Sequence, residues 1–561
     1  MQRFRIILII IFASVFCVGL FKNISYPLLW NDESETIMTA EKTLQFGYPK
    51  VHDGKNIIYL PDEPTWIGYK KEIDANITIP WGSYYFATIS AFLSNQTDDI
   101  YLKSALARIP FAAIGLLGLI IFALSVKEFF NDKSTYQKFI IAFIAIEIFS
   151  VALFLHMREA RYYSLVIFMT ACFFYVFINY FLHRKYSFKK YLLLMVPVLF
   201  ITYQINIIAF ATCCLTIAIY EIAGRVAVIF SNDNKKQKVR LKELIIPALK
   251  NLTPLFITAI IIIPFIIFYD TFNTAARAKA HYVNMPGFLP QLDRIIFILK
   301  TMEFFYPVVF MKALQVIVWF RNKQVPNLKA DPQNNILEKL TFFMSSFFII
   351  FSLFAANMPF LFIRYFIVLQ PIMTLILLTD IIIVSKYISS HVKKNLKLFI
   401  RLTLAVIFIR LVFISLGEKI NLQKNYIYQI THQLKGPLDY LIPYVKENFK
   451  NTEDLVLATN YEELSYIYYL GCKVTLGYMN KNLEEDLKYQ PDIMIYRKKW
   501  GHNPEHYNNF IQKAAYNKVA FPVYDSPVNN IAEFYGNMEH QFKTKMATNE
   551  ADKTEILIRV K

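Results

Sequence analysis

Long apolar runs separated by short polar segments fill the chain as far as residue 416. A membrane-spanning helix needs about 20 predominantly apolar residues, and this pattern predicts eleven spans. They are residues 4–22, 104–126, 137–156, 161–182, 191–205, 207–229, 251–269, 303–320, 340–357, 361–384 and 396–416. The fifth run is short and meets the sixth at residues 203–206, which predicts either a tight turn or a broken helix at that point.

Charge between the runs predicts how the chain is oriented. With eleven spans, the basic loops 183–190 (net +4), 225–250 (+5), 321–339 (+2) and 386–397 (+4) fall on the side of the N-terminus. The long loop 23–103 falls on the other side and carries a net charge of −5. Cytoplasmic loops of membrane proteins are rich in Lys and Arg. We therefore expect a cytoplasmic N-terminus and a non-cytoplasmic C-terminal region. The abundance of Lys, Asn and Ile suggests a bacterial inner (plasma) membrane.

The long outer loop contains two short stretches with helical character. Residues 34–46 place apolar side chains at helical spacing, and residues 83–93 form an apolar stretch too short to span a bilayer. Both are expected to be interfacial helices that lie along the membrane surface. Between them, residues 51–80 are rich in Pro, Gly, Asp and Tyr, which predicts a loop.

The polar tail has a different pattern. Strand-like runs at 454–460, 473–478, 491–496 and 555–560 alternate with a helical stretch at 462–470. Strands alternating with helices indicate a small α/β layer domain. The predicted fold class is therefore an all-α polytopic membrane bundle, residues 1–416, followed by an outward-facing α/β domain, residues 417–561.

Composition narrows the functional classes. The net charge is +18, but residues 417–561 are neutral overall, so the whole excess belongs to the membrane part. This distribution indicates topology and contact with membrane lipids, and does not indicate nucleic-acid binding. The five cysteines have no spacing typical of a disulfide framework or a zinc site.

Candidate chemistry begins at Asp32-Glu33, directly after the first apolar run. Carboxylates at the mouth of a span are costly to desolvate and are retained where a substrate proton, water or a cation uses them. Asp32 is suited to take a proton from an acceptor hydroxyl or amine, and Glu33 is suited to orient it. The alternative is that both acids only cap a helix N-terminus. Together with Glu159 they are also ligand types for a divalent metal ion, so metal dependence stays open.

Two further clusters fall on the same outer face. One is Arg158-Glu159-Ala160-Arg161-Tyr162-Tyr163, and the other is Arg364-Tyr365. Guanidinium groups bind phosphate oxygens well, and the tyrosines offer amphipathic surface to a sugar or lipid. If residues 158–161 are helical, Arg158 and Arg161 share a face and form a phosphate clamp. The alternative is that these arginines anchor the spans at the lipid headgroups.

These motifs resemble the GT-C superfamily of integral membrane glycosyltransferases, on the branch with protein O-mannosyltransferases and the lipid A aminoarabinose transferase. The resemblance is patchy over most of the chain. Asp32-Glu33 resembles the acidic motif of the family's first loop, and residues 80–85 resemble its Pro-Pro-x-Tyr-Tyr element with Trp81 in place of the second proline. Arg108-Ile109-Pro110, residues 158–163 and Arg364-Tyr365 with Pro371 resemble later elements of the family.

The resemblance implies a donor in which a sugar is linked to polyprenyl or dolichyl phosphate, used on the non-cytoplasmic side. It also implies Asp32 as the catalytic base. The expected function is sugar transfer to a glycan, lipid or protein acceptor, with Arg108, Arg158, Glu159, Arg161, Tyr162, Arg364 and Tyr365 binding substrate. Three alternatives remain: a transporter or flippase of lipid-linked glycans, a glycan polymerase or ligase, and an inactive assembly subunit.

Overall fold

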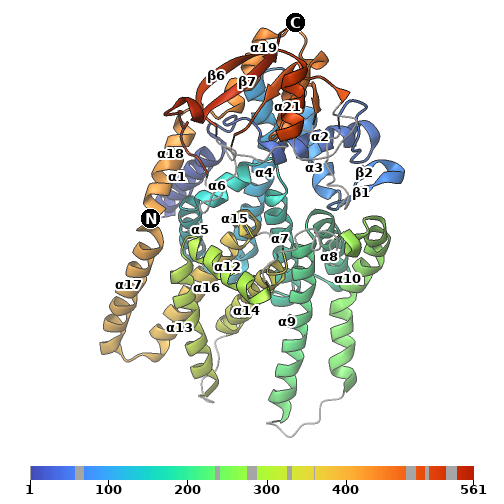
Figure 1. Ribbon diagram of the computed structural model, residues 1–561. Helices are drawn as coiled ribbons and strands as arrows, with labels where there is room; N and C mark the ends of the chain where they lie inside the picture. Colours follow the sequence, from blue (N-terminus) through green and yellow to red (C-terminus); the bar gives the residue numbers. More distant parts are fainter. Residues whose placement is uncertain are drawn as a thin grey trace.

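The computed structural model describes residues 2–56, 68–233, 241–274, 287–324, 332–358, 361–417, 419–475, 488–498, 504–525 and 540–560. Helices form an elongated bundle, and a small sheet with its own helices covers one end of it (Figure 1). The structure confirms the predicted fold class of a helical membrane bundle followed by a small α/β unit.

The bundle helices follow the predicted runs. They are α1 (Gln2–Phe21), α4 (Ile100–Ser125), α5 (Lys133–Ile148), α6 (Val151–Arg158), α7 (Tyr163–Phe177), α8 (Phe188–Ile205), α9 (Ile207–Asp233), α10 (Leu241–Phe268), α12 (Phe288–Thr301), α13 (Phe305–Gln324), α14 (Pro332–Ala355), α15 (Ile363–Phe366), α16 (Leu369–His391) and α17 (Lys394–Gly417). Short turns η2 (Lys127–Phe129) and η3 (Ile178–Leu182) extend α4 and α7.

The described residues account for most of the eleven predicted spans. Within the described residues, nine helices are long and apolar enough to cross a membrane, and the pair α5 and α6, bent by 77°, makes ten if it is one span. The chain is therefore an integral membrane protein. The predicted span 303–320 corresponds to α13, which is not among these nine helices. The predicted span 137–156 is broken where Ser150 caps α6 by accepting from the Leu153 N–H group.

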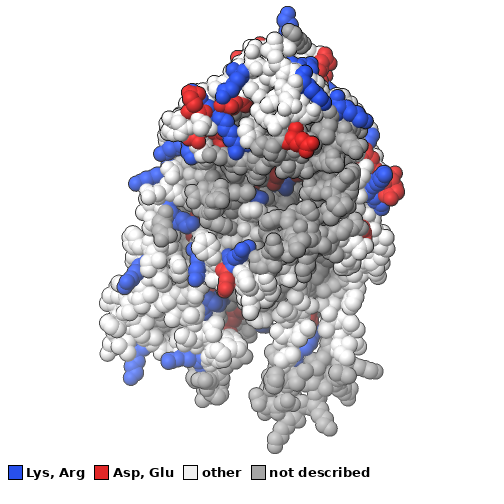
Figure 2. Space-filling view, in the orientation of Figure 1, with Lys and Arg blue, Asp and Glu red and all other residues white. Residues whose placement is uncertain are grey.

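The two ends of the bundle differ in charge. The α16–α17 turn and the facing ends of α9 and α10 lie at the end far from the sheet (Figure 1). Acidic and basic side chains mix on the sheet end, whereas basic side chains predominate at the opposite end (Figure 2). This is the distribution that the predicted orientation requires, and the orientation itself stays a prediction.

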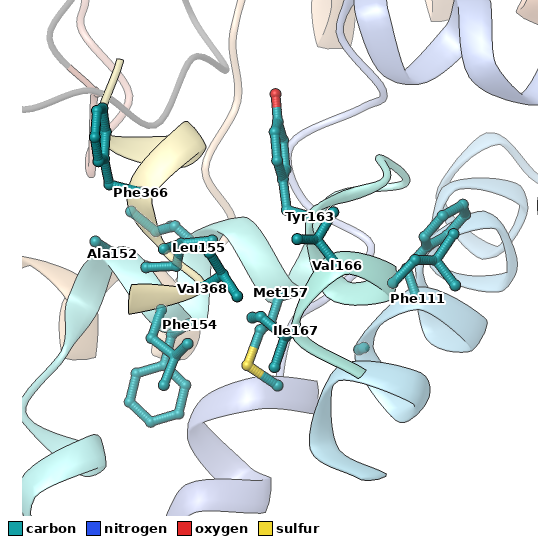
Figure 3. Close-up of a cluster of buried hydrophobic side chains, with 14 of the residues drawn as sticks. Phe111, Ala152, Phe154, Leu155, Met157, Tyr163, Val166, Ile167, Phe366 and Val368 are labelled. Atoms are coloured by element: carbon teal, nitrogen blue, oxygen red, sulfur yellow. The ribbon is translucent and has the colours of Figure 1, made fainter. Parts of the chain in front are cut away.

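Small residues allow the central helices α4 and α7 to pack closely. A methyl group added at Gly118 would lie 2.9 Å from the Phe168 backbone, and one at Gly115 would lie 2.9 Å from the Met157 side chain. Such close approach is typical of helix packing in membranes. Figure 3 shows part of the resulting core, which includes Phe111 of α4, Met157 of α6 and Ile167 of α7.

The outer loop supports this end of the bundle. Helices α2 (Asn31–Phe46) and α3 (Gly82–Ser94) match the predicted stretches, and the predicted loop between them contains β1 (Tyr69–Lys70), η1 (Lys71–Ile73) and β2 (Ala75–Asn76). Residues 57–67 of that predicted loop lie outside the described residues. Half of the residues of α2 are buried within the protein, and its position along the membrane surface stays a prediction.

The C-terminal unit is a five-stranded mixed sheet in the order β4-β3-β5-β7-β6. Its elements are α18 (Lys419–Thr431), α19 (Leu438–Asn448), η4 (Thr452–Asp454), β3 (Val456–Thr459), α20 (Glu463–Leu470), β4 (Lys473–Thr475), β5 (Ile493–Ile495), α21 (Pro504–Lys513), β6 (Tyr516–Tyr524), η8 (Glu550–Asp552) and β7 (Lys553–Arg559). Strands β3, β4, β5 and β7 match the predicted strands, although residues 476–478 lie outside the described part. The sequence analysis missed β6, an edge strand that contains Pro522, because proline weakens a strand pattern.

Candidate functional site

The candidate site begins at the N-terminus of α2. Helix α2 starts directly after Trp30, and its first turn carries Asp32 and Glu33, followed by Glu35. Carboxylates at a helix N-terminus interact favourably with the helix dipole, which explains why three acids are tolerated here. Their side chains differ in exposure: 32% for Asp32, 1% for Glu33 and 20% for Glu35.

Glu33 is fully engaged with Arg108 of α4. The Arg108 Nε and Nη2 atoms donate to the two Glu33 carboxylate oxygens at 2.8 and 2.6 Å. The Ala160 N–H group also donates to Glu33 at 2.9 Å. Arg108 donates as well to the carbonyls of Ile24 and Pro27, at 3.0 and 2.6 Å. This bidentate buried pair therefore joins α2, α4 and the loops that flank them.

Asp32 faces Arg161 instead. The guanidinium lies 3.6 Å from the Asp32 carboxylate and 3.5 Å from that of Glu35. It also donates to the Asp32 carbonyl and the Thr36 hydroxyl, each at 2.9 Å. These contacts hold one guanidinium against two carboxylates, and the Asp32 carboxylate keeps a third of its surface exposed. The structure thus brings together Asp32 and Arg161, from the first and second predicted clusters.

Glu35 was missed as a site residue in the sequence analysis. It lies three residues after Asp32 on the same helix, and this spacing was the available signal because such residues share a face. The Tyr84 hydroxyl donates to it at 3.4 Å. Burial raises the pKa of Glu35, Asp32 raises it further, and Arg161 and Tyr84 oppose the shift. Glu35 therefore becomes protonated at a higher pH than an exposed glutamate does.

Arg158 points elsewhere, contrary to the expected shared face with Arg161. Helix α6 ends at Arg158 because Glu159 adopts an extended backbone (φ −69°, ψ 141°). The Arg158 guanidinium donates to the Tyr426 hydroxyl at 3.2 Å, and to the carbonyls of Lys22 and Asn23 at 3.2 and 2.7 Å. The condition for a joint clamp, a helical connection over residues 158–161, is not met.

Glu159 is buried behind these arginines with a side-chain exposure of 8%. Among the described residues, its carboxylate oxygens have no hydrogen-bond partner, although the His156 ring lies 3.4 Å away. Within the described part of the chain, no group of three or more His, Cys, Asp or Glu residues is arranged to hold a metal ion. Asp32, Glu33 and Glu159 therefore do not form a shared metal site there.

The third predicted cluster borders a pocket next to the acids. The pocket has an empty volume of about 340 Å³, part of which is open to solvent, and is lined by Tyr162, Tyr163, Val166, Asn206, Ile208, Phe351, Met358, Arg364, Tyr365, Ile367 and Val368. Figure 3 shows the Tyr163 ring extending away from the core cluster, with Val166 at its base. An aromatic wall with one guanidinium suits a ligand that has an apolar part and an anionic group.

Two observations connect the pocket to Asp32. The Arg364 guanidinium lies 5.6 Å from the centre of the Trp30 ring, directly before α2, and 4.2 Å from that of Phe362. The Arg161 guanidinium lies 5.9 Å from the centre of the Tyr162 ring, which lines the pocket. Arg161 and the start of α2 therefore lie close to residues that line the pocket.

Comparison with known proteins adds little beyond the fold. No protein-family model matches the chain, and no curated protein matches it. Among solved structures, the chain is similar to the crystal structure of ArnT from Cupriavidus metallidurans in the apo state. The TM-score is 0.49 and the sequence identity 10%, over 99% of this chain and 98% of that chain. At this level of similarity, the functional assignment depends on the site.

Fold and site together define the class of protein. It is an integral membrane protein whose helical bundle meets a C-terminal sheet domain at one end. At that junction lies a carboxylate–guanidinium cluster beside an aromatic pocket. This constellation is suited to proton abstraction next to a bound anionic ligand.

Proposed function

We propose that the protein is a membrane glycosyltransferase of the GT-C type. It transfers a sugar from a polyprenyl-phosphate donor to a glycan, lipid or protein acceptor on the non-cytoplasmic face. The observation that carries this proposal is the position of Asp32: it is the most exposed of the three acids, faces Arg161, and adjoins the pocket that contains Arg364. The resemblance of Asp32-Glu33 and Arg364-Tyr365 to GT-C motifs supports the same assignment.

In this mechanism Asp32 is the catalytic base. The acceptor oxygen or nitrogen attacks the anomeric carbon, and the bond from that carbon to the phosphate oxygen breaks. The acceptor proton passes to the Asp32 carboxylate, and polyprenyl phosphate leaves with the electron pair. A general base typically accelerates such a step by about 10²–10⁴-fold. A single displacement of this kind inverts the anomeric configuration.

The arginines have different roles in the proposal. Arg364 binds the donor phosphate at the pocket wall, where Tyr162 and Tyr365 contact the sugar or the first isoprene units. Arg161 holds Asp32 and Glu35 in place and offsets the negative charge that gathers as phosphate departs. Arg108 and Glu33 position α2, and Arg158 ties α6 to the N-terminal helix, so none of these three touches the reacting atoms.

The proposal is tested by native mass spectrometry of the purified protein in detergent. We compare wild type, Asp32→Asn and Arg364→Ala with a control, Asp98→Asn, which changes an exposed acid of the same outer loop. We expect a co-purified polyprenyl-phosphate sugar to accumulate in Asp32→Asn, to be lost in Arg364→Ala and to be unchanged in Asp98→Asn. A diphosphate-linked oligosaccharide in every variant would contradict the proposal and favour a polymerase or flippase.

One observation favours a transporter as the second candidate. Lys312 of α13 lies 3.0 Å from Asp380 of α16, whose side chain is completely buried, and the Thr341 hydroxyl of α14 donates to Asp380 at 2.7 Å. Charges paired across helices are typical of transport pathways. If transport is the function, Asp380→Asn abolishes movement of lipid-linked glycan in proteoliposomes while Asp32→Asn has no effect. If the protein is a glycosyltransferase, Asp32→Asn should reduce sugar transfer much more than Asp380→Asn does.

A further inference from the structure

The C-terminal domain holds the segment that carries Asp32. Helix α20 packs against α2, and two of its side chains bond the backbone of Leu29. The Leu29 N–H group donates to the Tyr469 hydroxyl at 2.8 Å, and the Ser465 hydroxyl donates to the Leu29 carbonyl at 3.0 Å. The Tyr469 hydroxyl also lies 2.6 Å from that of Ser104 on α4, so it joins three elements.

The other flank of Trp30 is held by the start of α20. The Asn31 side-chain amide donates to Glu463 at 3.3 Å, and its oxygen accepts from the Leu464 N–H group at 3.0 Å. One turn further along α2, the hydroxyls of Ser34 and Ser465 lie 3.2 Å apart, and both residues are completely buried. Residues on both sides of Asp32 are therefore hydrogen-bonded to a single helix of the other domain.

The turn that leads into α20 is itself firmly held. Glu462 has a left-handed backbone (φ 64°), which is unfavourable for a residue other than glycine. Its carboxylate pairs with Arg497, which also pairs with Asp525, and all three side chains are buried. Burial raises the pKa of the adjacent Tyr461 hydroxyl, and the charges of Glu462 and Asp32 raise it further. This strained turn is fixed by buried charges, and it sets the position of the first residues of α20, which bond Asn31 next to Asp32.

We propose that α20 is a positioning element of the active site: its hydrogen bonds to residues 29–34 set the position of the Asp32 carboxylate relative to Arg161. The role in transfer rests on the proposed function, whereas the restraint on residues 29–34 does not. A base must be held close to its productive position, because an error of about 1 Å can cost about 10²-fold in rate. The C-terminal domain is thus part of the catalytic apparatus.

The first test measures hydrogen exchange of the peptide that covers residues 28–36 in the full-length protein. The test variant is Tyr469→Phe with Ser465→Ala, and Tyr469→Phe alone is the milder version if the double variant does not fold. The control is Lys55→Ala, which removes a 2.8 Å bond to the Gly471 carbonyl at another contact between the outer loop and the same domain. We expect the peptide to exchange about three- to tenfold faster in the test variants than in wild type. In the control variant the exchange rate should equal that of wild type. Unchanged exchange would overturn the inference.

The second test separates positioning from folding by kinetics. We expect the test variants to lower kcat about tenfold with an unchanged KM for the donor lipid, since the donor pocket is untouched. Glu463→Gln keeps the oxygen that accepts from Asn31 and should stay near the wild-type rate, whereas Glu463→Leu should resemble the test variants. An unchanged kcat in the test variants would overturn the positioning role. A wild type that transfers no sugar from any lipid phosphate would refute the proposed function, and the exchange result would still decide whether α20 restrains residues 29–34.

Discussion

Two neighbouring acids on α2 each meet an arginine, and the two pairs differ in almost every physical property. Glu33 and Arg108 form a bidentate pair at 2.6 and 2.8 Å, with side-chain exposures of 1% and 6%. Asp32 and Arg161 are 3.6 Å apart, with exposures of 32% and 15%. The first pair has backbone partners on both sides, whereas the second leaves carboxylate surface open beside a pocket.

The two pairs have properties that suit different purposes: the first suits stabilisation of the fold, and the second suits proton transfer to or from a ligand. A buried pair whose hydrogen bonds are satisfied resists change, because removing one partner leaves a charge without compensation. A looser and more exposed pair contributes little to stability, and its carboxylate can still exchange a proton with a ligand. We therefore propose opposite roles for these adjacent positions, and substitutions at the two pairs should separate loss of folding from loss of function.

The largest effect is expected for Asp32→Asn. Without the base, sugar transfer should fall by about 10²–10⁴-fold, while the melting temperature stays close to wild type. The measurement is the transfer rate from the donor identified by mass spectrometry, with Asp98→Asn as the matched control. A variant that loses stability instead of activity would place Asp32 in the same structural category as Glu33.

Arg108→Ala should show the opposite pattern. Glu33 would be left buried and unpaired, at a cost of about 3–5 kcal/mol in the free energy of unfolding. Thermal unfolding in detergent checks this result. The double variant Glu33→Leu/Arg108→Met, which buries no charge, should recover much of the lost stability. Equal instability of the single and double variants would show that the pair contributes packing rather than charge compensation.

Tyr426→Phe tests whether Arg158 belongs with the structural pair. The change removes the 3.2 Å bond from Arg158 and the 2.7 Å bond to the Gly19 carbonyl. We expect a loss of about 1 kcal/mol in the free energy of unfolding, with donor lipid retained at the wild-type level in native mass spectrometry. Loss of the donor lipid would indicate that Arg158 takes part in binding the donor phosphate.

The smallest effect is expected for Glu35→Gln, and its sign depends on pH. Burial raises the folded-state pKa of Glu35 above the unfolded value of about 4.3. The folded protein therefore binds this proton more tightly, and the stability that it adds is present below the unfolded pKa and lost as the pH rises through the folded pKa. Glu35→Gln should remove that loss, so its melting temperature should exceed that of wild type at neutral pH and not at pH 4. The same difference at both pH values would contradict the shifted pKa.

Much of the architecture was predictable because it depends on local patterns. Hydropathy located the helices of the bundle, and the acids after the first run were recognised as candidates from their position alone. The broken span at Ser150 and the edge strand β6 were not predicted. Strand β6 depends on its pairing with β7, which compensates for a weak local pattern. The break at Ser150 is a local cap inside a continuous apolar run, which a hydropathy pattern does not detect.

The roles of individual charges were less predictable. The repeated arginines at 158 and 161 suggested a joint clamp, and the structure directs one toward residues 22 and 23 and the other toward α2. The direction changes because the backbone of Glu159 is extended, a feature that no spacing rule indicates. Glu35 lies two residues after Glu33 in the sequence, and its contact with Arg161 distinguishes it.

The sequence by itself determined the membrane class, the α/β tail and the position of an acidic motif directly after the first span. These features follow from apolar length, strand periodicity and charge, which are properties of neighbouring residues. Only the tertiary structure decided that Arg108 pairs with Glu33 and that Arg161 faces Asp32. It also decided that α20 holds residues 29–34, which carry both acids. Those pairings join residues 75 to 440 positions apart, and the free energy of a charge depends on what surrounds it in space rather than along the chain.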